Sequence, residues 1–206
     1  GKYATENDIK ETQLDITYAK NMRLTPEKIR DMDTDVEKFP EIFRTYNAKL
    51  RQMQMIDYDD QMIYALRILE QYPEVLAHFR EQYRYFCVDE AQDTSKIQHD
   101  MIDLLAAQSR NLFMVGDVKQ SIYRFRLARP ELFMDKYASF STEESLQQRI
   151  DLHMNFRSRA QVLDFCNDIF YKIMSPDLGR VAYDRDAALY YGAKNYDENA
   201  KGFKPE

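Results

Sequence analysis

The 206-residue sequence is poor in the residues that build phosphate-binding loops and disulfide frameworks. It contains 5 glycines, 6 prolines, 2 cysteines and no tryptophan. So few glycines and prolines exclude collagen-like and low-complexity chains. Neither G-x-x-x-x-G-K-[ST] nor G-x-G-x-x-G can be written anywhere in the sequence, which excludes a glycine-rich cradle for phosphates within it. A nucleotide site built from this sequence alone would lack that cradle.

Long apolar runs are also absent. None reaches the roughly 18–20 residues that cross a bilayer, and the N-terminus lacks the apolar stretch of a signal peptide. The two cysteines, Cys87 and Cys166, lie inside short apolar runs, which favours buried, reduced thiols over a disulfide or a metal site. These features predict a soluble, cytoplasmic protein with no membrane partner.

The composition is otherwise that of a folded protein. Hydrophobic residues make up 44% of the chain and charged residues 31%, enough for a core. The net charge of −6 argues against a surface that binds polyphosphates as a whole, but leaves a local basic groove open.

Residues 1–83 have helical patterns. Thr25-Pro26 is typical of a helix start, with Thr25 as the cap. Apolar residues at helical spacing predict an amphipathic helix over 36–53, a second over 58–71 and a third after Pro73. We interpret these apolar stripes as core packing and residues 1–83 as an all-helical segment.

From residue 84 the pattern becomes α/β. Two short apolar runs, 85–88 and 112–115, end in Asp89-Glu90 and Gly116-Asp117, with a helical pattern between them. Strand, helix and strand in this order predict a buried parallel sheet with acidic groups at its carboxyl edge. A further helix over about 130–137 and a polar linker complete a second part, residues 84–148.

The third part, residues 149–206, begins after the linker Ser141–Gln148. We predict a strand over 150–152 and a helix over 158–174, with no clear periodicity beyond. Directly after the predicted strand, Arg157 could stabilise charge on a transferring phosphoryl group and Phe156 could stack on a purine. The alternative is an ordinary helix N-terminus with Ser158 as its cap.

Two acidic clusters are candidate sites. In Val88–Asp93, adjacent carboxylates at a strand tip could divide labour, one fixing Mg²⁺ and the next orienting a water, although an acidic turn in solvent has the same pattern. In Asp57–Asp60, three carboxylates could hold a cation, or could complement a helix dipole.

The stretch 119–129 has four cations and no acid, interleaved with two aromatic rings. Cations that follow phosphates and rings that stack on bases are the usual means of binding single strands. A basic helix face in solvent is the equally weighted alternative. The residues concerned are Lys119, Tyr123, Arg124, Phe125, Arg126 and Arg129.

In this order and spacing, the clusters resemble the superfamily 1 helicases of the UvrD/Rep type. Within that family, 116–128 and Tyr190–Ala193 are similar to the AddA/RexA subunit of bacterial ATP-dependent helicase/nucleases, with Phe125 where most relatives have Trp. The matching segments are Asp57–Asp60 with the helix motif upstream of the Walker B strand, Val88–Thr94 with motif II, Val115–Arg126 with motif III and Asn155–Ser158 with motif IV.

The resemblance implies a role for each matching residue. In the nucleotide site, Asp89 would hold Mg²⁺, Glu90 would be the general base for the attacking water, and Gln120 would sense the γ-phosphate. Asp117 would link that site to motif III. From the second domain, Arg157 would reach the γ-phosphate and Phe156 would lie against adenine. Single-stranded DNA would meet Tyr123, Phe125 and Arg126.

The resemblance also implies a fold and a function. The fold would be α/β, a partial RecA-like P-loop NTPase core with the end of an accessory 1B-like domain before it. ATP hydrolysis with Mg²⁺ would drive 3′-to-5′ translocation on single-stranded DNA and duplex unwinding in double-strand break repair, beside an AddB/RexB-like second subunit. Because the P-loop is missing, we expect the chain to be a fragment that alone hydrolyses ATP negligibly.

Two other functions stay open on the residues themselves. One is a DNA-binding or regulatory module without ATPase activity. The other is a metal-dependent nuclease that uses Asp57, Asp59, Asp89 and Glu90.

Overall fold

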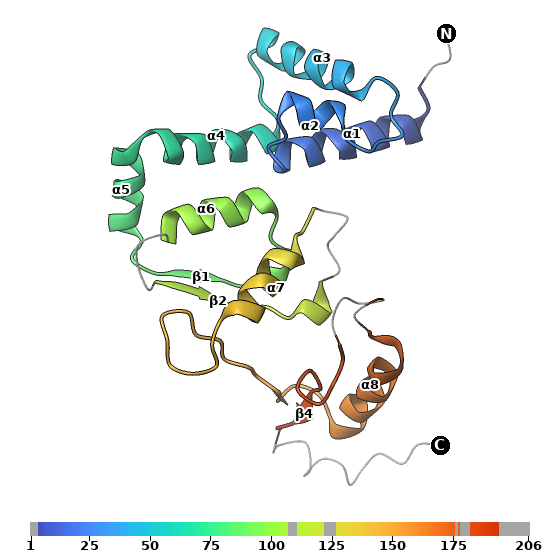
Figure 1. Ribbon diagram of the computed structural model, residues 1–206, viewed down its shortest axis with the longest axis vertical. Helices are drawn as coiled ribbons and strands as arrows, with labels where there is room; N and C mark the ends of the chain where they lie inside the picture. Colours follow the sequence, from blue (N-terminus) through green and yellow to red (C-terminus); the bar gives the residue numbers. More distant parts are fainter. Residues whose placement is uncertain (1–3, 107–110, 122–126, 176, 178–181, 194–206) are drawn as a thin grey trace. The chain divides into compact units, whose positions relative to one another are not determined.

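A computed structural model describes residues 4–106, 111–121, 127–175, 177 and 182–193 (Figure 1). The chain divides into two compact units, residues 1–138 and 139–206, and each is described by itself. The division into 1–83, 84–148 and 149–206 stays a prediction.

Five helices form the N-terminal part of the first unit. Thr25 caps α2 through its side-chain oxygen, which accepts from the Lys28 amide, as the sequence predicts. The helix predicted from residue 36 begins at Phe39 instead, because Lys38 before it has a left-handed backbone with φ 58°. The helices are α1 (Glu6–Asn21), α2 (Pro26–Arg30), α3 (Phe39–Gln52), α4 (Tyr58–Gln71) and α5 (Pro73–Gln82).

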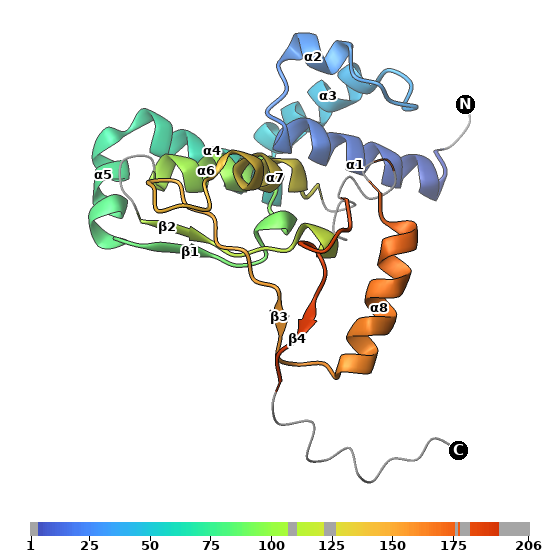
Figure 2. The ribbon, with the colours of Figure 1, turned by 60° about the horizontal axis from the view of Figure 1, so that its bottom comes forward.

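The apolar stripe of α3 packs in a core, as predicted. Phe39 is fully buried and clusters with Ile16 and Ala19 of α1 and Ile29 of α2. Its ring lies 5.9 Å from that of Phe43, centroid to centroid. Figures 1 and 2 both show α1, α2 and α3 grouped together.

The predicted strand–helix–strand unit is present. β1 (Phe86–Val88) and β2 (Leu112–Met114) pair in parallel, with Phe86 opposite Leu112 and Val88 opposite Met114. α6 (Lys96–Ala106) connects them and packs against α4 and α5. Figure 2 shows α6 on one side of the two strands. α7 (Pro130–Ser139) follows.

The prediction that Cys87 is buried is wrong. Cys87 and its register partner Phe113 project from the same face of the sheet, and both are exposed. Within the described part of the chain this face has no helix packed on it, so the apolar run of β1 is only half covered. Cys166 is partly buried, and both cysteines are free thiols.

The second unit contains one helix and two short strands among its described residues. β3 (Met154–Asn155) pairs in parallel with β4 (Tyr190–Tyr191), and α8 spans Ala160–Ile173. The strand predicted over 150–152 is therefore displaced: Ile150 is 68% and Leu152 81% exposed. The partner strand β4 has no periodicity long enough to reveal it in the sequence.

The structure is thus mixed α/β, with small parallel sheets and an N-terminal helical segment, as predicted at that level. No helix in the described residues is both long and apolar enough to span a bilayer.

Candidate functional site

The two strands of the first unit bring their acidic ends together. The Val115 amide donates to the Val88 carbonyl at 2.8 Å, and the Ala91 amide donates to the Val115 carbonyl at 2.9 Å. Because parallel strands end at the same edge, these bonds place the loop that starts at Asp89 beside the loop that starts at Gly116. Both predicted acidic tips therefore belong to one site.

Glu90 sits in this site with a left-handed backbone, φ 50°. Its amide donates to Asp89 Oδ1 at 3.0 Å, and both side chains are exposed. The Glu90 carbonyl accepts from the Asp93 amide at 2.8 Å, which closes the short helix η1 (Ala91–Asp93). Hydrogen bonds thus hold the backbone at these two residues, while their carboxylates are exposed and can contact a ligand.

The side chains around Asp89 fit a Mg²⁺ site in which the protein supplies only one or two ligands, rather than a site in which it supplies all of them. Among the described residues, no three His, Cys, Asp or Glu side chains gather closely enough to hold a metal ion. Mg²⁺ commonly takes one or two carboxylates and completes its shell with waters and nucleotide phosphates. Exposed Asp89 meets that requirement.

Gln92 joins the two loops through its side chain. Its amide is completely buried; Nε2 donates to Glu90 Oε2 at 2.7 Å and Oε1 accepts from the Asp117 amide at 2.9 Å. The sequence offers Gln92 only as part of a motif, so this role was missed. A glutamine two residues after the predicted base was the available signal.

Asp117 organises the start of the second loop. Its Oδ1 accepts from the Lys119 amide and pairs with Lys119 Nζ, both at 3.0 Å, while Oδ2 accepts from Gln120 Nε2 at 3.0 Å. Asp117 and Gln120 are therefore in direct contact, and Gln120 is exposed. Tyr123, Phe125 and Arg126, the predicted DNA-binding residues, lie outside the described residues.

The predicted residues of the second unit lie at the start of α8. Asn155 Oδ1 accepts from the amides of Arg157 and Ser158 at 2.9 and 2.8 Å, and Arg159 caps the helix without a side-chain bond. Ser158 is thus not the cap, because α8 begins at Ala160 and Arg159 precedes it. Phe156 is 69% exposed and Arg157 is exposed.

Phe156 lies against Gly192. A Cβ at Gly192 would be 2.8 Å from the edge of the Phe156 ring, and the Gly192 amide donates to the Asn155 carbonyl at 2.9 Å. The glycine of the Tyr190–Ala193 segment therefore lets β4 pass close to the ring and leaves the rest of the ring open.

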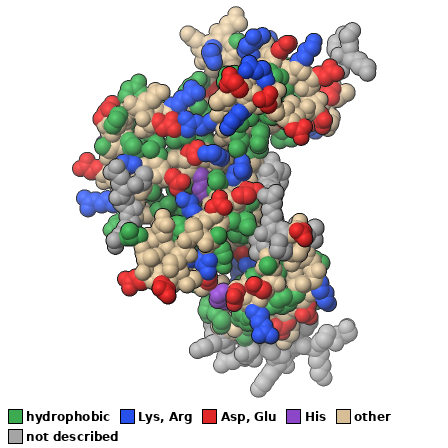
Figure 3. All heavy atoms as spheres, viewed as in Figure 1, with side chains coloured by type: hydrophobic (Ala, Val, Ile, Leu, Met, Phe, Trp, Pro, Cys, Tyr) green, Lys and Arg blue, Asp and Glu red, His purple; other side chains and the backbone are tan. Residues whose placement is uncertain are grey.

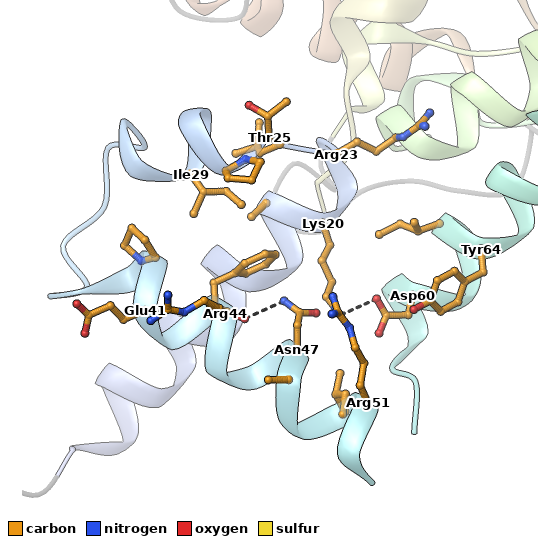
Figure 4. A pocket seen from close by; sticks show the side chains of 18 of the residues that line it. Lys20, Arg23, Thr25, Ile29, Glu41, Arg44, Asn47, Arg51, Asp60 and Tyr64 are labelled. Carbon is orange, nitrogen blue, oxygen red and sulfur yellow. Dashed lines mark hydrogen bonds and ion pairs between the residues drawn. The ribbon is translucent and has the colours of Figure 1, made fainter. Parts of the chain in front are cut away.

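The Asp57–Asp60 cluster is a structural site. Asp57 caps α4 by accepting from the Asp60 amide at 2.8 Å. Lys20 Nζ, from α1, lies 2.6 Å from Asp57 Oδ2 and 2.8 Å from Asp60 Oδ1, and the Lys20 side chain is 3% exposed. Figure 4 shows Lys20 reaching toward Asp60 between the two helices. A lysine ammonium thus pairs with two of the three carboxylates in the way that a bound cation would.

Burial and these contacts shift the local pKa values. Burial raises the pKa of Asp57, but the hydrogen bonds from Lys20, the Asp60 amide and Tyr46 outweigh it, so the net pKa is below its ordinary value. Burial and the Asp57 carboxylate raise the pKa of Tyr46 to about 12. These contacts therefore stabilise the charged form of the Asp57 carboxylate.

A groove of about 920 Å³ lies beside this ion pair, between α1, α2, α3 and α4. Figure 3 shows basic side chains on the viewed face of these helices. Three of the cations that line it form ion pairs: Lys20 with Asp57 and Asp60, Arg23 with Glu70, and Arg30 with Glu27. The lining cations are Lys20, Arg23, Arg30, Arg44, Arg51 and Arg67.

Residues 2–141 match the model of the UvrD/REP helicase N-terminal domain. That stretch contains both loops of the site. The chain belongs to the UvrD/REP helicase family. The predicted resemblance to this family is therefore confirmed.

Relatives narrow the resemblance to one subunit type of the helicase/nucleases. The "Exonuclease/helicase subunit RexA" of Lactococcus lactis subsp. cremoris (strain MG1363) is 42% identical over 179 residues, 85% of this chain and 15% of the relative. The A-type subunit of an ATP-dependent helicase/nuclease of Alkaliphilus oremlandii (strain OhILAs) is 48% identical over 150 residues, 72% of this chain and 12% of the relative. The chain thus spans about a seventh of the length of such relatives.

Proposed function

We propose that this chain carries the water-activating part of the ATP-hydrolysis site of a DNA helicase, as part of an AddA/RexA-type helicase/nuclease subunit. The observation that supports this most is the junction of the two loops, where Gln92 ties the Glu90 carboxylate to the loop of Asp117 and Gln120. It supports a shared site for the candidate base and the candidate phosphate sensor, because α/β sheets bind ligands at the carboxyl ends of their strands.

The residues have the following parts in the reaction. Glu90 accepts the proton of the water that attacks the γ-phosphate, because its carboxylate is exposed and its orientation is fixed by Gln92. Gln120 donates to the γ-phosphate from the position in which Asp117 holds it. Asp89 holds Mg²⁺, which neutralises phosphate charge in such sites.

The second unit supplies two further groups. Arg157 stabilises charge on the γ-phosphoryl group, and Phe156 packs against adenine with the ring surface that Gly192 leaves open. The glycine-rich phosphate cradle comes from sequence outside this chain, since none can be written within it.

DNA binds to the segment that follows Gln120. Its rings and cations, Tyr123, Phe125 and Arg126, suit stacking on bases and pairing with phosphates. We infer that the parent protein works in the bacterial cytoplasm on single-stranded and duplex DNA, moves 3′ to 5′, acts in double-strand break repair and assembles with a second, AddB/RexB-like subunit. The names of its relatives support the helicase/nuclease activity and the presence of a further subunit, and the motif resemblance suggests the rest.

Glu90→Gln in the full-length protein tests the proposal. The amide keeps the size of the side chain but cannot accept the proton, so we expect ATP turnover to fall by about 10²–10⁴-fold while nucleotide binding is retained. Turnover is measured by phosphate release and binding by a fluorescent ATP analogue.

Glu81→Gln, at an exposed position in α5, is the matched control and should leave both measurements unchanged. Full ATP turnover in the Glu90→Gln variant would contradict the assignment.

A further inference from the structure

Gly192 lies against the ring of Phe156, and space rather than backbone conformation requires a glycine there. Its φ is not positive, so its backbone is one that other residues can also adopt. A Cβ added at Gly192 would lie 2.8 Å from Phe156 Cε1 and 3.1 Å from both Cδ1 and Cζ. Any larger residue at this position would therefore have to displace the ring.

These three distances show which part of the ring Gly192 covers. Cδ1 and Cζ are the two neighbours of Cε1 in the ring, and both are only slightly farther from the added Cβ than Cε1 is. A Cβ in the plane of the ring would be much farther from these two atoms than from Cε1. Gly192 therefore lies over the rim of one face of the ring. Since Phe156 is 69% exposed, the opposite face is open to a ligand.

Hydrogen bonds hold the backbone on both sides of Phe156. The Gly192 amide donates to the Asn155 carbonyl at 2.9 Å, next to the pairing of β3 with β4 (Figure 2). Asn155 Oδ1 accepts from the amides of Arg157 and Ser158 at 2.9 and 2.8 Å. The freedom left to Phe156 is rotation of its side chain, and Gly192 limits that rotation on the side of β4.

We propose that Gly192 is a positioning residue for the base of the nucleotide. Its backbone supports one face of Phe156 and so presents the other face to a purine. A phenyl ring has no hydrogen-bonding group, so this contact selects by the area of the stacked base and favours purines over pyrimidines. This inference rests on the proposed function, because it takes Phe156 as the residue that packs against the base.

Gly192→Ala in the full-length protein tests the role of the glycine. The added methyl group displaces the ring, which is exposed enough to turn into solvent without unfolding the unit. We expect the KM for ATP to rise about tenfold, within the range that stacking of a base on an aromatic ring contributes. The kcat at saturating ATP and the melting temperature should change little. Inorganic tripolyphosphate, which has no base, should inhibit the variant and the parent equally.

Two nucleoside diphosphates test the selection of purines. As competitive inhibitors, ADP should weaken about tenfold in the Gly192→Ala variant and CDP by less than about threefold, because the pyrimidine has the smaller stacking surface. Equal weakening of ADP and CDP would contradict selection by stacked area.

A double variant tests whether Gly192 acts through Phe156. Phe156→Ala alone should raise the KM for ATP by about the same factor as Gly192→Ala. Adding Gly192→Ala to it should then have no further effect, because the ring that the methyl group displaces is gone. Val162→Ile is the matched control: it adds one carbon at a 52% exposed position of α8 in the same unit and should leave every measurement unchanged.

The outcomes separate this role from the proposed function. If Phe156→Ala raises the KM for ATP while Gly192→Ala leaves it at the parent value, the ring contacts the base and the role of Gly192 is refuted. Multiplied effects in the double variant, or a joint loss of melting temperature and tripolyphosphate affinity in Gly192→Ala, would also refute it, because Gly192 would then act on the fold. An unchanged KM in Phe156→Ala would refute both the role of Gly192 and the adenine contact.

Discussion

Glu90 has the backbone conformation that glycine usually takes. A non-glycine residue in the left-handed region costs about 1–2 kcal/mol, and φ at Glu90 is 50°. The Ala91 amide donates to the Val115 carbonyl, and the Asp93 amide donates to the Glu90 carbonyl. These two hydrogen bonds hold the backbone of Glu90 in this conformation. The chain thus accepts local strain at the residue that we propose to be the base, where strain is commonly tolerated for function.

At Gly116, by contrast, glycine is required because there is no room for a side chain. The Gln92 amide and the Phe133 ring occupy the place of its side chain. The sequence has too few glycines for a phosphate loop, but it keeps this one where two loops must approach each other.

Phe125→Ala tests the single-strand contact at the level of one ring. If Phe125 stacks on a base, the loss of the ring should weaken oligonucleotide binding by about 1–3 kcal/mol. Fluorescence anisotropy with a labelled single strand measures the change in the full-length protein.

Tyr85→Ala is the aromatic control, because Tyr85 is 83% exposed just before β1, away from the carboxyl ends of the strands. Equal affinity in parent and Phe125→Ala proteins would mean that the ring belongs to the core.

At the scale of elements, α1 and α4 are joined by the buried ion pair of Lys20. Its ammonium contacts Asp57, the cap of α4, and Asp60 in the first turn. The two acids therefore complement the helix dipole, as the sequence suggests. They also bind the Lys20 ammonium, which lies 37 residues before Asp57 in the chain. Only the second function explains why Lys20 is buried.

Lys20→Met should destabilise the first unit. A buried ion pair that loses one partner leaves an uncompensated charge at a typical cost of roughly 3–5 kcal/mol. Because the Asp57 and Asp60 side chains keep 21% and 13% exposure, we expect about 2–3 kcal/mol. Urea unfolding followed by circular dichroism measures it.

Arg23→Met is the matched control, since it breaks an ion pair between Arg23 and Glu70 of α4 whose side chains are 35% and 36% exposed. Such a surface pair contributes at most about 1 kcal/mol. If the two variants lose equal stability, the burial of Lys20 has no energetic consequence.

At the scale of the whole molecule, we expect the lack of a glycine-rich phosphate cradle in this sequence to limit ATP hydrolysis by the chain alone. The chain brings the proposed base and sensor together, but no glycine-rich loop can be written within its sequence. We expect the 206-residue chain alone to hydrolyse ATP at least about 100-fold more slowly than the full-length protein, since the loss of a single oriented donor has a comparable effect.

Phosphate release by the purified chain, with and without single-stranded DNA, tests this expectation. The full-length protein serves as the positive control. Turnover by the chain that depends on Glu90 would contradict it, and would mean that residues within this sequence bind the triphosphate.

Local structure follows from the sequence alone. The cap at Thr25 predicted the start of α2, and the spacing of apolar residues predicted a helix from residue 58, where α4 begins. The two runs that end in acids predicted the parallel strands. These signals lie within a few residues of the element they define. They also predicted that Asp89, Glu90 and Asp117 lie at one sheet edge.

Features that depend on distant partners are visible only in the folded chain. The strand expected over 150–152 is found at Met154–Asn155 because β4 pairs there. Cys87 is exposed because no described helix packs on its face of the sheet. Gln92 joins two loops because its amide meets Asp117, 25 residues later. Burial and hydrogen bonds of this kind depend on segments far apart in the sequence, so the local periodicity of apolar residues does not predict them.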